Sequence, residues 1–397
     1  MRSAVDVIVV GLGPIGAGAL RRVAAAGASC VGIGQAEPPS LPDHTGVFAS
    51  HYDSGRVTRH VDARFEWAEL ARRAIADYPH LEATSGIAFH HPSSVLYSTD
   101  DPATIEAIEL VARGLAMHGI AIERLTAAGD DRIALPDGVA VFAEGPPAGH
   151  VDPRRLIAAQ LATAERAGAE VVRAIVTHLA HDGRGWHVSL DDGRSMTAER
   201  VVLAGGPHTD ELVGALRPPP SGVPELSVRG ETVVTAVLDE DELARLEGLP
   251  AVLSPVDHPA FADVYAVPPT AYPDGTVRLK LGATRHAPFR LDDREARTAW
   301  MRGDRHTREL DDLRRLTEAL VPGLRALRWE TKPCLLTDTP TDLPYVDHLA
   351  DGLVIAAGCN GYAAKSGDAI GAVAAELLLT GRWVDTVLEA RAFRLGG

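Results

Sequence analysis

The sequence of 397 residues contains only three cysteines and no apolar run of membrane-spanning length. Cys30, Cys334 and Cys359 offer neither an even disulfide framework nor a metal-ligand spacing, which suits a reducing cytoplasm. A transmembrane helix needs roughly 20 consecutive apolar residues. The apolar stretch 7–20 contains glycines, follows Asp6 rather than a basic segment and has no small-residue cleavage site, which argues against a signal peptide. We therefore expect a cytoplasmic protein with no membrane partner.

Positive charge is also scarce, because 39 Lys and Arg face 54 Asp and Glu and give a formal net charge of −15. This acidity argues against a nucleic-acid partner, whose phosphates would be repelled over most of the surface. The 16 histidines form no His-Glu-x-x-His pattern or other ligand spacing, so we expect no metal site. A P-loop and a nucleophilic serine elbow are absent as well.

Lysine is the scarcest basic residue, since only Lys280, Lys332 and Lys365 occur among the 39 Lys and Arg. A lysine that persists in an arginine-rich chain is expected where a compact ammonium or a titratable amine cannot be replaced by a planar guanidinium. Any one of them could equally be a chance surface residue. All three, however, lie inside motifs that are described below.

The chain opens with the pattern of a dinucleotide-binding unit. We expect a strand over 5–10, followed by the glycine loop Gly11-Leu12-Gly13-Pro14-Ile15-Gly16. A helix over 17–26 and a second strand over 29–33 complete the unit. Such glycines let a pyrophosphate approach the helix N-terminus, although the pattern is also compatible with a turn that binds nothing. An acidic residue that binds a ribose hydroxyl is expected about 20 residues further on, where the chain has Gly34. Either Gln35 or Glu37 takes its place, or the adenosine end is held more loosely.

The rest of the chain alternates nucleotide-domain segments with strand-rich segments. We expect helices over 64–77, 104–118, 153–167 and 298–320, and a last helix that runs to Thr380. We expect strands over 87–98, 170–179, 185–190, 200–204, 228–237, 263–268, 276–283 and 352–357, and a long loop over 34–59. Asp152 is expected to cap the helix that Pro153 begins, and the proline-rich stretch 216–224 marks a crossing between domains. This order predicts an α/β fold in which a discontinuous Rossmann-like domain is interleaved with a second domain.

Several specific motifs follow one another along nearly the whole chain. Besides the glycine loop they are Ser50-His51-Tyr52-Asp53-Ser54-Gly55-Arg56-Val57-Thr58-Arg59-His60, Val151-Asp152-Pro153, the strand 201–206, Leu279-Lys280-Leu281-Gly282, Lys332-Pro333-Cys334-Leu335-Leu336-Thr337-Asp338-Thr339-Pro340 and Gly358-Cys359-Asn360-Gly361-Tyr362-Ala363-Ala364-Lys365. In these motifs the chain resembles the flavin amine oxidases related to monomeric sarcosine oxidase, N-methyltryptophan oxidase and pipecolate oxidase, within the D-amino-acid-oxidase-like superfamily. The Ser-His loop and the Lys-x-Cys segment are far more specific than the glycine pattern.

The resemblance implies a Rossmann-like FAD-binding domain formed by 1–85, 150–215 and 330–397. A mixed-sheet α+β substrate domain is then formed by 86–149 and 216–329. The residues implied to contact FAD are Gly11, Gly13, Pro14, Ile15, Gly16, Gln35, Ser50, His51, Arg56, Val176, Gly205, Cys334, Gly358, Asn360, Gly361 and Lys365.

The resemblance also assigns catalytic roles. In the family, the cysteine that matches Cys334 forms a thioether to the 8α-methyl carbon of the flavin, whereas a free cysteine is more often just a small buried hydrophobe. Lys280 matches the lysine that assists the reaction with O2, where a fixed cation stabilises the charge that forms on oxygen. Arg59 and Lys365 match the two cations that hold the substrate carboxylate, and Tyr265 matches a tyrosine of the substrate pocket.

Three positions depart from the family pattern, and all of them concern the substrate. Leu336 stands where the family often has an aromatic residue, and Arg64 replaces a carboxylate five residues after the clamp arginine. Thr284 replaces a histidine four residues after the lysine that assists O2. We therefore expect the residues around the reacting ring and the substrate carboxylate to match the family, and the other residues of the substrate pocket to differ. We do not assign sarcosine as the substrate.

These features predict an FAD-dependent oxidase of a secondary or cyclic amino acid. Hydride transfer to flavin N5 would give an imine, and O2 would be reduced to hydrogen peroxide. The partners would be the amino acid and O2, and the protein would be a monomer or a weak homo-oligomer. Two alternatives stay open: a dehydrogenase of the same fold with another electron acceptor, and a non-catalytic flavin-fold binding protein.

Overall fold

The computed structural model describes residues 4–220 and 222–396, and one of its two nine-stranded sheets is built around parallel strands. The strands of this first sheet are β1 (Ala4–Val10), β2 (Cys30–Ile33), β9 (Glu170–Val172), β10 (Val176–His181), β11 (Trp186–Leu190), β12 (Ser195–Leu203), β13 (Leu216–Arg217), β20 (Tyr345–Ala350) and β21 (Leu353–Ala357). Parallel pairs join β1 to β2 and β12, and β12 to β21. β1 is the apolar run predicted over 5–10, and its side chains enter hydrophobic cores on both faces of the sheet.

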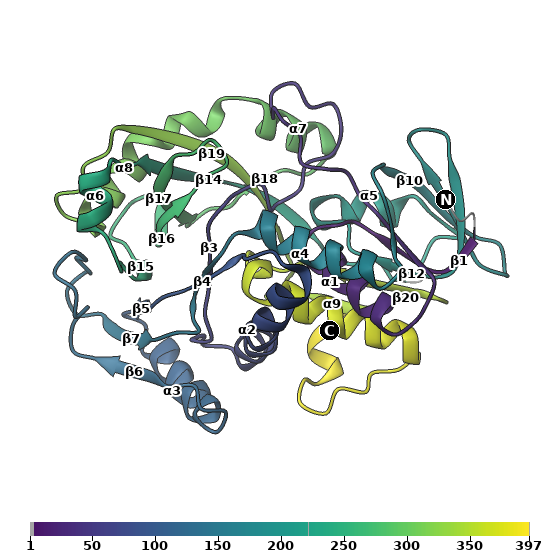
Figure 1. The fold of residues 1–397 in the computed structure, drawn as a ribbon, viewed down its shortest axis with the longest axis horizontal. Helices are drawn as coiled ribbons and strands as arrows, with labels where there is room; N and C mark the ends of the chain where they lie inside the picture. Colours follow the sequence, from purple (N-terminus) through teal and green to yellow (C-terminus); the bar gives the residue numbers. More distant parts are fainter. Residues whose placement is uncertain (1–3, 221, 397) are drawn as a thin grey trace.

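Helices cover one face of this sheet and pack against one another (Figure 1). They are α1 (Pro14–Ala25), α2 (Phe65–Ser85), α4 (Pro153–Arg166) and α9 (Ala363–Thr380). A side chain at Gly371 of α9 would collide with the backbone of α1, so these two helices are in close contact. The buried Asp368 of α9 joins three helices, because it accepts hydrogen bonds from Arg21 of α1 and Gln160 of α4, both at 2.8 Å. The glycine loop before α1 is thereby held firmly against α9.

Helix ends follow the local chemistry of the chain. Asp152 caps α4 as predicted, and its carboxylate accepts hydrogen bonds from two backbone N–H groups of the first turn at 2.9 and 3.1 Å. α2 is longer than the helix expected over 64–77, because its packing against α9 and α4 carries it past Pro79. It ends at Gly86, which adopts a left-handed conformation. No helix of the described residues combines the length and the apolar character that crossing a membrane requires.

The second nine-stranded sheet is largely antiparallel (Figure 1). Its strands are β5 (Val95–Thr99), β6 (Ile122–Leu125), β7 (Ala140–Glu144), β14 (Ser227–Val237), β15 (Ala251–Pro255), β16 (Phe261–Ala271), β17 (Val277–Arg285), β18 (Phe289–Arg290) and β19 (Arg328–Asp338). One face packs on α8 (Leu310–Leu320) in a core that contains Leu279 and Leu281 of β17. Because side chains alternate along a strand, Lys280 projects from the opposite face.

The single polar helix expected over 298–320 is interrupted. α7 (Arg294–Arg302) ends at Gly303, which is extended, and a 3₁₀ turn, η2 (Arg305–Glu309), leads into α8. The break gives the two helices separate packing partners. Trp300 of α7 lies against β14, whereas α8 covers the core of the second sheet.

A small three-stranded sheet lies between the two large ones. Its strands are β3 (Arg56–Thr58), β4 (His90–Pro92) and β8 (Gly149–Val151). β3 lies inside the segment 34–59 that was expected to be a loop, and its three residues pair with β8. The remaining elements are α3 (Pro102–Ala116), α5 (Thr209–Gly214), α6 (Glu240–Arg245), η1 (Gly206–His208) and η3 (Ala390–Phe393).

β19 changes the division of the chain that the sequence suggested. The boundary expected at 330 falls inside this strand, which pairs with β14 from 328 to 338 and so belongs to the second sheet. The return to the first sheet comes after Asp338, and Cys334 lies in the second sheet. Residues 1–3, 221 and 397, which the expected domain ranges include, lie outside the described residues.

Candidate active site

A cavity of about 610 Å³ lies between the ends of the parallel strands and the second sheet. One side follows the carboxyl ends of β1, β12 and β21, which is where open α/β sheets bind ligands. The other side is formed by β14, β16, β17 and β19. Every residue predicted to contact FAD lines this cavity: Gly11, Gly13, Pro14, Ile15, Gly16, Gln35, Ser50, His51, Arg56, Val176, Gly205, Cys334, Gly358, Asn360, Gly361 and Lys365.

Two glycines of the loop between β1 and α1 leave no room for a side chain. Gly11 has a φ of 92°, and a Cβ at this position would collide with the carbonyl oxygen of Ala204. A Cβ at Gly16 would collide with the carbonyl oxygen of Gly11. Gly13 is the N-cap of α1 and provides no side-chain capping bond, so the first N–H groups of the helix stay available to an anion. The loop therefore fits the pyrophosphate of a dinucleotide.

His51 adds an unpaired polar group beside this loop. Its Nδ1 atom is buried and has no hydrogen-bond partner among the described residues, and it lies 4.0 Å from the position of a Cβ on Gly13. Burial, reinforced by Arg154, lowers the pKa of His51 to about 3, so the imidazole is neutral. A neutral imidazole can donate one hydrogen bond and accept one. This orphaned nitrogen is consistent with a ligand in the cavity.

The two substitutes for the missing ribose acid lie in different places. Gln35 lines the cavity, and its amide oxygen accepts a hydrogen bond from the backbone of Val47 at 3.0 Å. Glu37 does not line the cavity, because its carboxylate binds the guanidinium of Arg154 at 2.6 and 2.7 Å. Gln35 is therefore the candidate that a bound nucleotide would meet.

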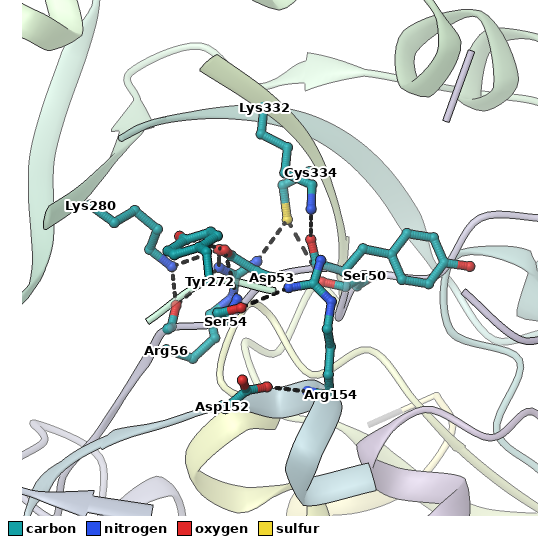
Figure 2. Close-up of polar contacts among 12 residues, drawn as sticks. Ser50, Asp53, Ser54, Arg56, Asp152, Arg154, Tyr272, Lys280, Lys332 and Cys334 are labelled. Atoms are coloured by element: carbon teal, nitrogen blue, oxygen red, sulfur yellow. Dashed lines mark hydrogen bonds and ion pairs between the residues drawn. The ribbon is translucent and has the colours of Figure 1, made fainter. Parts of the chain in front are cut away.

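Three side chains converge on the buried carboxylate of Asp53, and we name these four residues the Asp53 cluster (Figure 2). Lys280 Nζ and Tyr272 OH each donate a hydrogen bond to Asp53 at 2.9 Å, and Arg56 forms an ion pair with it. Burial favours the neutral acid, but Lys280 and Arg56 hold the pKa of Asp53 well below its usual value. Burial and Arg56 lower the pKa of Lys280 to about 8, against the opposing effect of Asp53.

Lys280 lies one layer behind the cavity wall. The family resemblance implies that Lys280 assists the reaction of the flavin with O2, but its side chain is only 1% exposed and does not line the cavity. Its ammonium also donates to the carbonyl oxygen of Gly55. The ring of Tyr265, which does line the cavity, has its centroid 5.4 Å from Nζ. The positive charge is therefore close to the cavity but not open to it.

A second aspartate holds the two cations of the predicted carboxylate clamp, and Arg59, Asp62 and Lys365 form the Asp62 cluster. The Oδ2 atom of Asp62 accepts hydrogen bonds from Arg59 Nη1 at 3.1 Å and from Lys365 Nζ at 2.7 Å. Burial alone would raise the pKa of Asp62, but Lys365 and Arg59 lower it to about 2. Burial and Arg59 lower the pKa of Lys365 to about 8, and Asp62 opposes this shift.

The Asp62 cluster keeps unused donors at the cavity wall. Arg59 and Lys365 both line the cavity, and among the described residues Asp62 is the only hydrogen-bond acceptor of either cation. A guanidinium has five N–H donors and an ammonium has three, so several remain. The rings of Tyr97 and Tyr362 flank the guanidinium, with centroids 5.1 and 5.8 Å from its carbon. The two cations can therefore bind another carboxylate without releasing Asp62.

The three cysteines differ in their access to the cavity. Cys334 lines it, and its sulfur lies 3.5 Å from Nη2 of Arg56 (Figure 2). Cys359 also lines it, but burial raises the pKa of this thiol to about 11 and keeps it protonated. Cys30 is buried in β2 and does not line the cavity. Of the two cysteines at the cavity, Cys334 is thus the one that lies beside a cation, which favours it for the predicted attachment.

The rest of the wall contains two of the three departures from the family pattern. Leu336 and Thr284 line the cavity, as Tyr265 does, whereas Arg64 is not among the lining residues and donates to a backbone carbonyl oxygen at 2.6 Å. Asp263 also lines the cavity and is the cross-strand neighbour of Thr284. It forms no ion pair with any described residue, and burial raises its pKa. Two of the three departures from the family pattern are therefore on the cavity wall.

Sequence reasoning gave no role to Asp53, Asp62 or Asp263. The first two stand three residues from an arginine, in Asp53-Ser54-Gly55-Arg56 and Arg59-His60-Val61-Asp62. This spacing of opposite charges around β3 was the signal in the sequence that could have pointed to the two aspartates. It cannot be distinguished from two solvated surface pairs until the segment is known to be buried. Asp263 lies in an ordinary strand pattern that gave no indication.

Solved structures with the same fold include both oxidases and a dehydrogenase. The chain is similar to NikD, an unusual amino acid oxidase essential for nikkomycin biosynthesis, with 22% identity over 99% of this chain and 98% of that chain and a TM-score of 0.74. Iminodiacetate oxidase from Chelativorans sp. BNC1 has 19% identity over 98% and 99% of the two chains, with a TM-score of 0.73. L-Proline dehydrogenase from P. horikoshii has 16% identity over 98% and 96%, with a TM-score of 0.74. At these identities the likeness shows the shared fold.

A search of curated proteins found no match to the sequence. A family model matches residues 6–377, and it describes the DAO family of FAD dependent oxidoreductases. The match spans both large sheets, the glycine loop and all the cavity residues named above. The α/β fold and the superfamily resemblance predicted from the sequence are confirmed. The chain belongs to the DAO family of FAD dependent oxidoreductases.

Proposed function

We propose that the protein is an FAD-dependent oxidase that converts a secondary or cyclic amino acid to an imine and reduces O2 to hydrogen peroxide. The observation that carries this proposal is the pair of buried cations, Arg59 and Lys365, whose unused donors meet the cavity. An arginine and a lysine side by side are well suited to a carboxylate. Because the glycine loop opens into the same cavity, FAD and an amino acid can meet there.

The residues of the cavity fit FAD. The glycine loop offers free N–H groups to the pyrophosphate, His51 offers an unpaired nitrogen, and Cys334 offers a thiol for the thioether. FAD, when bound, supplies a two-electron acceptor that takes a hydride from the carbon next to nitrogen and passes the electrons to O2. The protein contributes position and charge.

Arg59 and Lys365 hold the substrate carboxylate and thereby fix the carbon that carries the nitrogen. Tyr265, Tyr362 and Leu336 add aromatic and apolar surface to the same cavity. A site poor in water disfavours a charged amine and so favours the neutral form that can give up a hydride. Each of these residues acts on the substrate by position or by environment.

Lys280 supports the reaction with O2 from behind the wall. It keeps a buried positive charge next to Tyr265, and a fixed cation in a site of low dielectric stabilises negative charge that develops on oxygen. Arg56, in the same cluster, lines the cavity itself and adds a second positive charge.

The test is an anaerobic titration of the purified holoenzyme with a panel of N-methyl and cyclic amino acids and their methyl esters. A substrate bleaches the visible absorbance of the flavin, and we expect free acids to do so far better than esters. Admission of O2 should then restore the colour with one hydrogen peroxide for each imine. Bleaching by esters as fast as by acids would contradict the carboxylate clamp.

The position of Lys280 also favours a second candidate, a dehydrogenase that uses another electron acceptor. Its ammonium is paired with Asp53 and does not line the cavity, so it offers O2 less direct access than an open lysine would. The two functions differ in the rate at which air restores the colour of the reduced protein. Faster recovery with a quinone or dye than with O2, and no stoichiometric peroxide, would favour the dehydrogenase.

A further inference from the structure

The carboxylate of Asp62 lies against the same two cations that we propose for the substrate. Its Oδ2 atom accepts hydrogen bonds from Arg59 and Lys365, and its Oδ1 atom accepts one from the backbone N–H of Arg64 at 3.0 Å. The chain therefore satisfies Asp62 without any ligand. A substrate carboxylate adds to the remaining donors, so Asp62 and the substrate share Arg59 and Lys365.

The net charge of this cluster decides which ligands it attracts. Arg59 and Lys365 carry two positive charges and Asp62 carries one negative charge, which leaves one net positive charge. The three residues are 4%, 2% and 5% exposed, so water and salt screen these charges only weakly. One carboxylate neutralises the cluster, and a second carboxylate finds no counter-charge in it.

The other titratable groups around the cluster do not supply that counter-charge. Glu144 of β7 accepts a hydrogen bond from the backbone N–H of His60 at 2.9 Å and contacts the ring of the same residue. Tyr97 and Tyr362 stay neutral because burial raises the pKa of both phenols. Asp263 places a further carboxyl group on the cavity wall. Apart from the imidazole of His60, these neighbours are tyrosines or carboxylic acids. The other arginines of the cavity wall, Arg56, Arg229 and Arg294, are paired with Asp53, Asp338 and Glu211.

We propose that Asp62 determines substrate specificity by setting the clamp at one net positive charge, so that the site selects amino acids with one carboxylate over those with two. This inference rests on the proposed function, because it takes Arg59 and Lys365 as the substrate clamp. It also has a consequence for pH. Asp62 opposes the loss of the Lys365 proton, so an uncharged residue in its place lets Lys365 become neutral at a lower pH.

The test measures binding by the holoenzyme with two ligands that contain no nitrogen and cannot be oxidised as amines. Cyclopentanecarboxylate carries one carboxylate, and cis-cyclopentane-1,3-dicarboxylate carries two on the same ring. Titration calorimetry at about pH 6, which is below the pKa of about 8 that Lys365 has in wild type, gives the affinities of wild type, Asp62→Asn and Asp62→Glu. Asparagine has nearly the same size and removes the charge, but its single amide oxygen can accept either from Arg64 or from the two cations.

We expect wild type to prefer the monocarboxylate. Asp62→Asn should shift the ratio of the two affinities toward the dicarboxylate by roughly tenfold or more, because a buried counter-charge next to the ligand is gone. Asp62→Glu retains the charge and should keep the wild-type ratio. At about pH 8 the affinities of Asp62→Asn should have fallen further than those of wild type, because Lys365 has lost more of its charge.

An unchanged ratio in Asp62→Asn, or an equal change for both ligands, overturns the role of Asp62 and leaves the clamp intact. A shift in Asp62→Glu as large as that in Asp62→Asn shows that the side chain acts through shape, and this also overturns the proposal. If wild type binds neither carboxylate, Arg59 and Lys365 are not a carboxylate clamp, and the proposed function fails together with this inference.

Discussion

The Asp53 and Asp62 clusters are built from the same parts but face the cavity differently. Each joins one aspartate to an arginine three residues away on the segment around β3, and each takes one lysine from a distant element. In the Asp62 cluster both cations line the cavity with donors to spare. In the Asp53 cluster the lysine donates its hydrogen bonds to Asp53 and Gly55 and does not line the cavity. Unused donors at the cavity wall, rather than charge alone, are the reason that we propose the Asp62 cluster and not the Asp53 cluster as the binding site for a carboxylate.

The largest expected effect is all or none and concerns Cys334, which borders the Asp53 cluster through Arg56. The acid-precipitated wild-type protein should keep its yellow colour in the pellet, whereas Cys334→Ala should release the flavin into the supernatant. Cys359→Ala changes a second cysteine of the same cavity and should behave like wild type. Absorbance of the two fractions measures the outcome, and colour in the wild-type supernatant would exclude the covalent link.

The next effect separates the two lysines. Lys280→Met should slow reoxidation by O2 roughly 10²–10³-fold, because charge on oxygen forms without its counter-charge, and should leave anaerobic flavin reduction nearly intact. Lys365→Met should do the reverse and weaken substrate binding with little effect on reoxidation. Stopped-flow absorbance resolves both half-reactions. Equal losses in the two half-reactions for either variant would mean that the two clusters do not act on separate half-reactions.

A smaller effect is expected from Arg59→Ala, which removes one half of the clamp. The KM for an amino acid should rise roughly 10- to 150-fold, since each charged hydrogen bond to a carboxylate contributes about 1.5–3 kcal/mol. The KM for the methyl ester of the same amino acid should change little, which provides the control. Steady-state peroxide production measures both. A parallel rise for acid and ester would assign Arg59 to a structural role.

The smallest effect is a pH dependence that both clusters share. Lys280 and Lys365 each have a pKa lowered to about 8, so each is mostly charged below that pH and loses its charge above it. Reoxidation and carboxylate affinity should therefore both decline, by up to roughly tenfold between about pH 7 and pH 9. Lys280→Arg stays charged and should remove the decline in reoxidation only, while restoring just part of the rate. A decline that persists in this variant would come from another group.

Local patterns predicted the fold better than the site. The glycine loop, the buried strand before it and the Asp152 cap follow from neighbouring residues, and the structure contains all three. The break at Gly303 was missed because polar helical spacing continues on both sides of it. The place of β19 depends on pairing with β14, some 100 residues away in the chain, which no local pattern reveals.

The site could be predicted as a set of residues but not as a set of contacts. Every residue predicted for the cofactor lines one cavity. The contact between Lys280 and Asp53, however, joins two segments that are more than 200 residues apart in the chain. The alternation Leu279-Lys280-Leu281 does indicate which face the lysine leaves from. It does not indicate whether an aspartate lies on that side of the sheet to accept a hydrogen bond from the lysine. The same is true of Asp62, whose spacing from Arg59 would be equally common on a solvated surface.

The buried Asp368 has a consequence for how such an enzyme can change over evolutionary time. It stands one helical turn after Lys365 in α9 and anchors that helix to α1, which follows the glycine loop. Lys365, which we propose for the clamp, and the glycine loop, which fits the cofactor, are thus held by the same pair of helices on the first sheet. Tyr265, Thr284 and Leu336 stand on β16, β17 and β19 of the other sheet. Mutations at these three positions can change the cavity wall without altering the contact between α9 and α1.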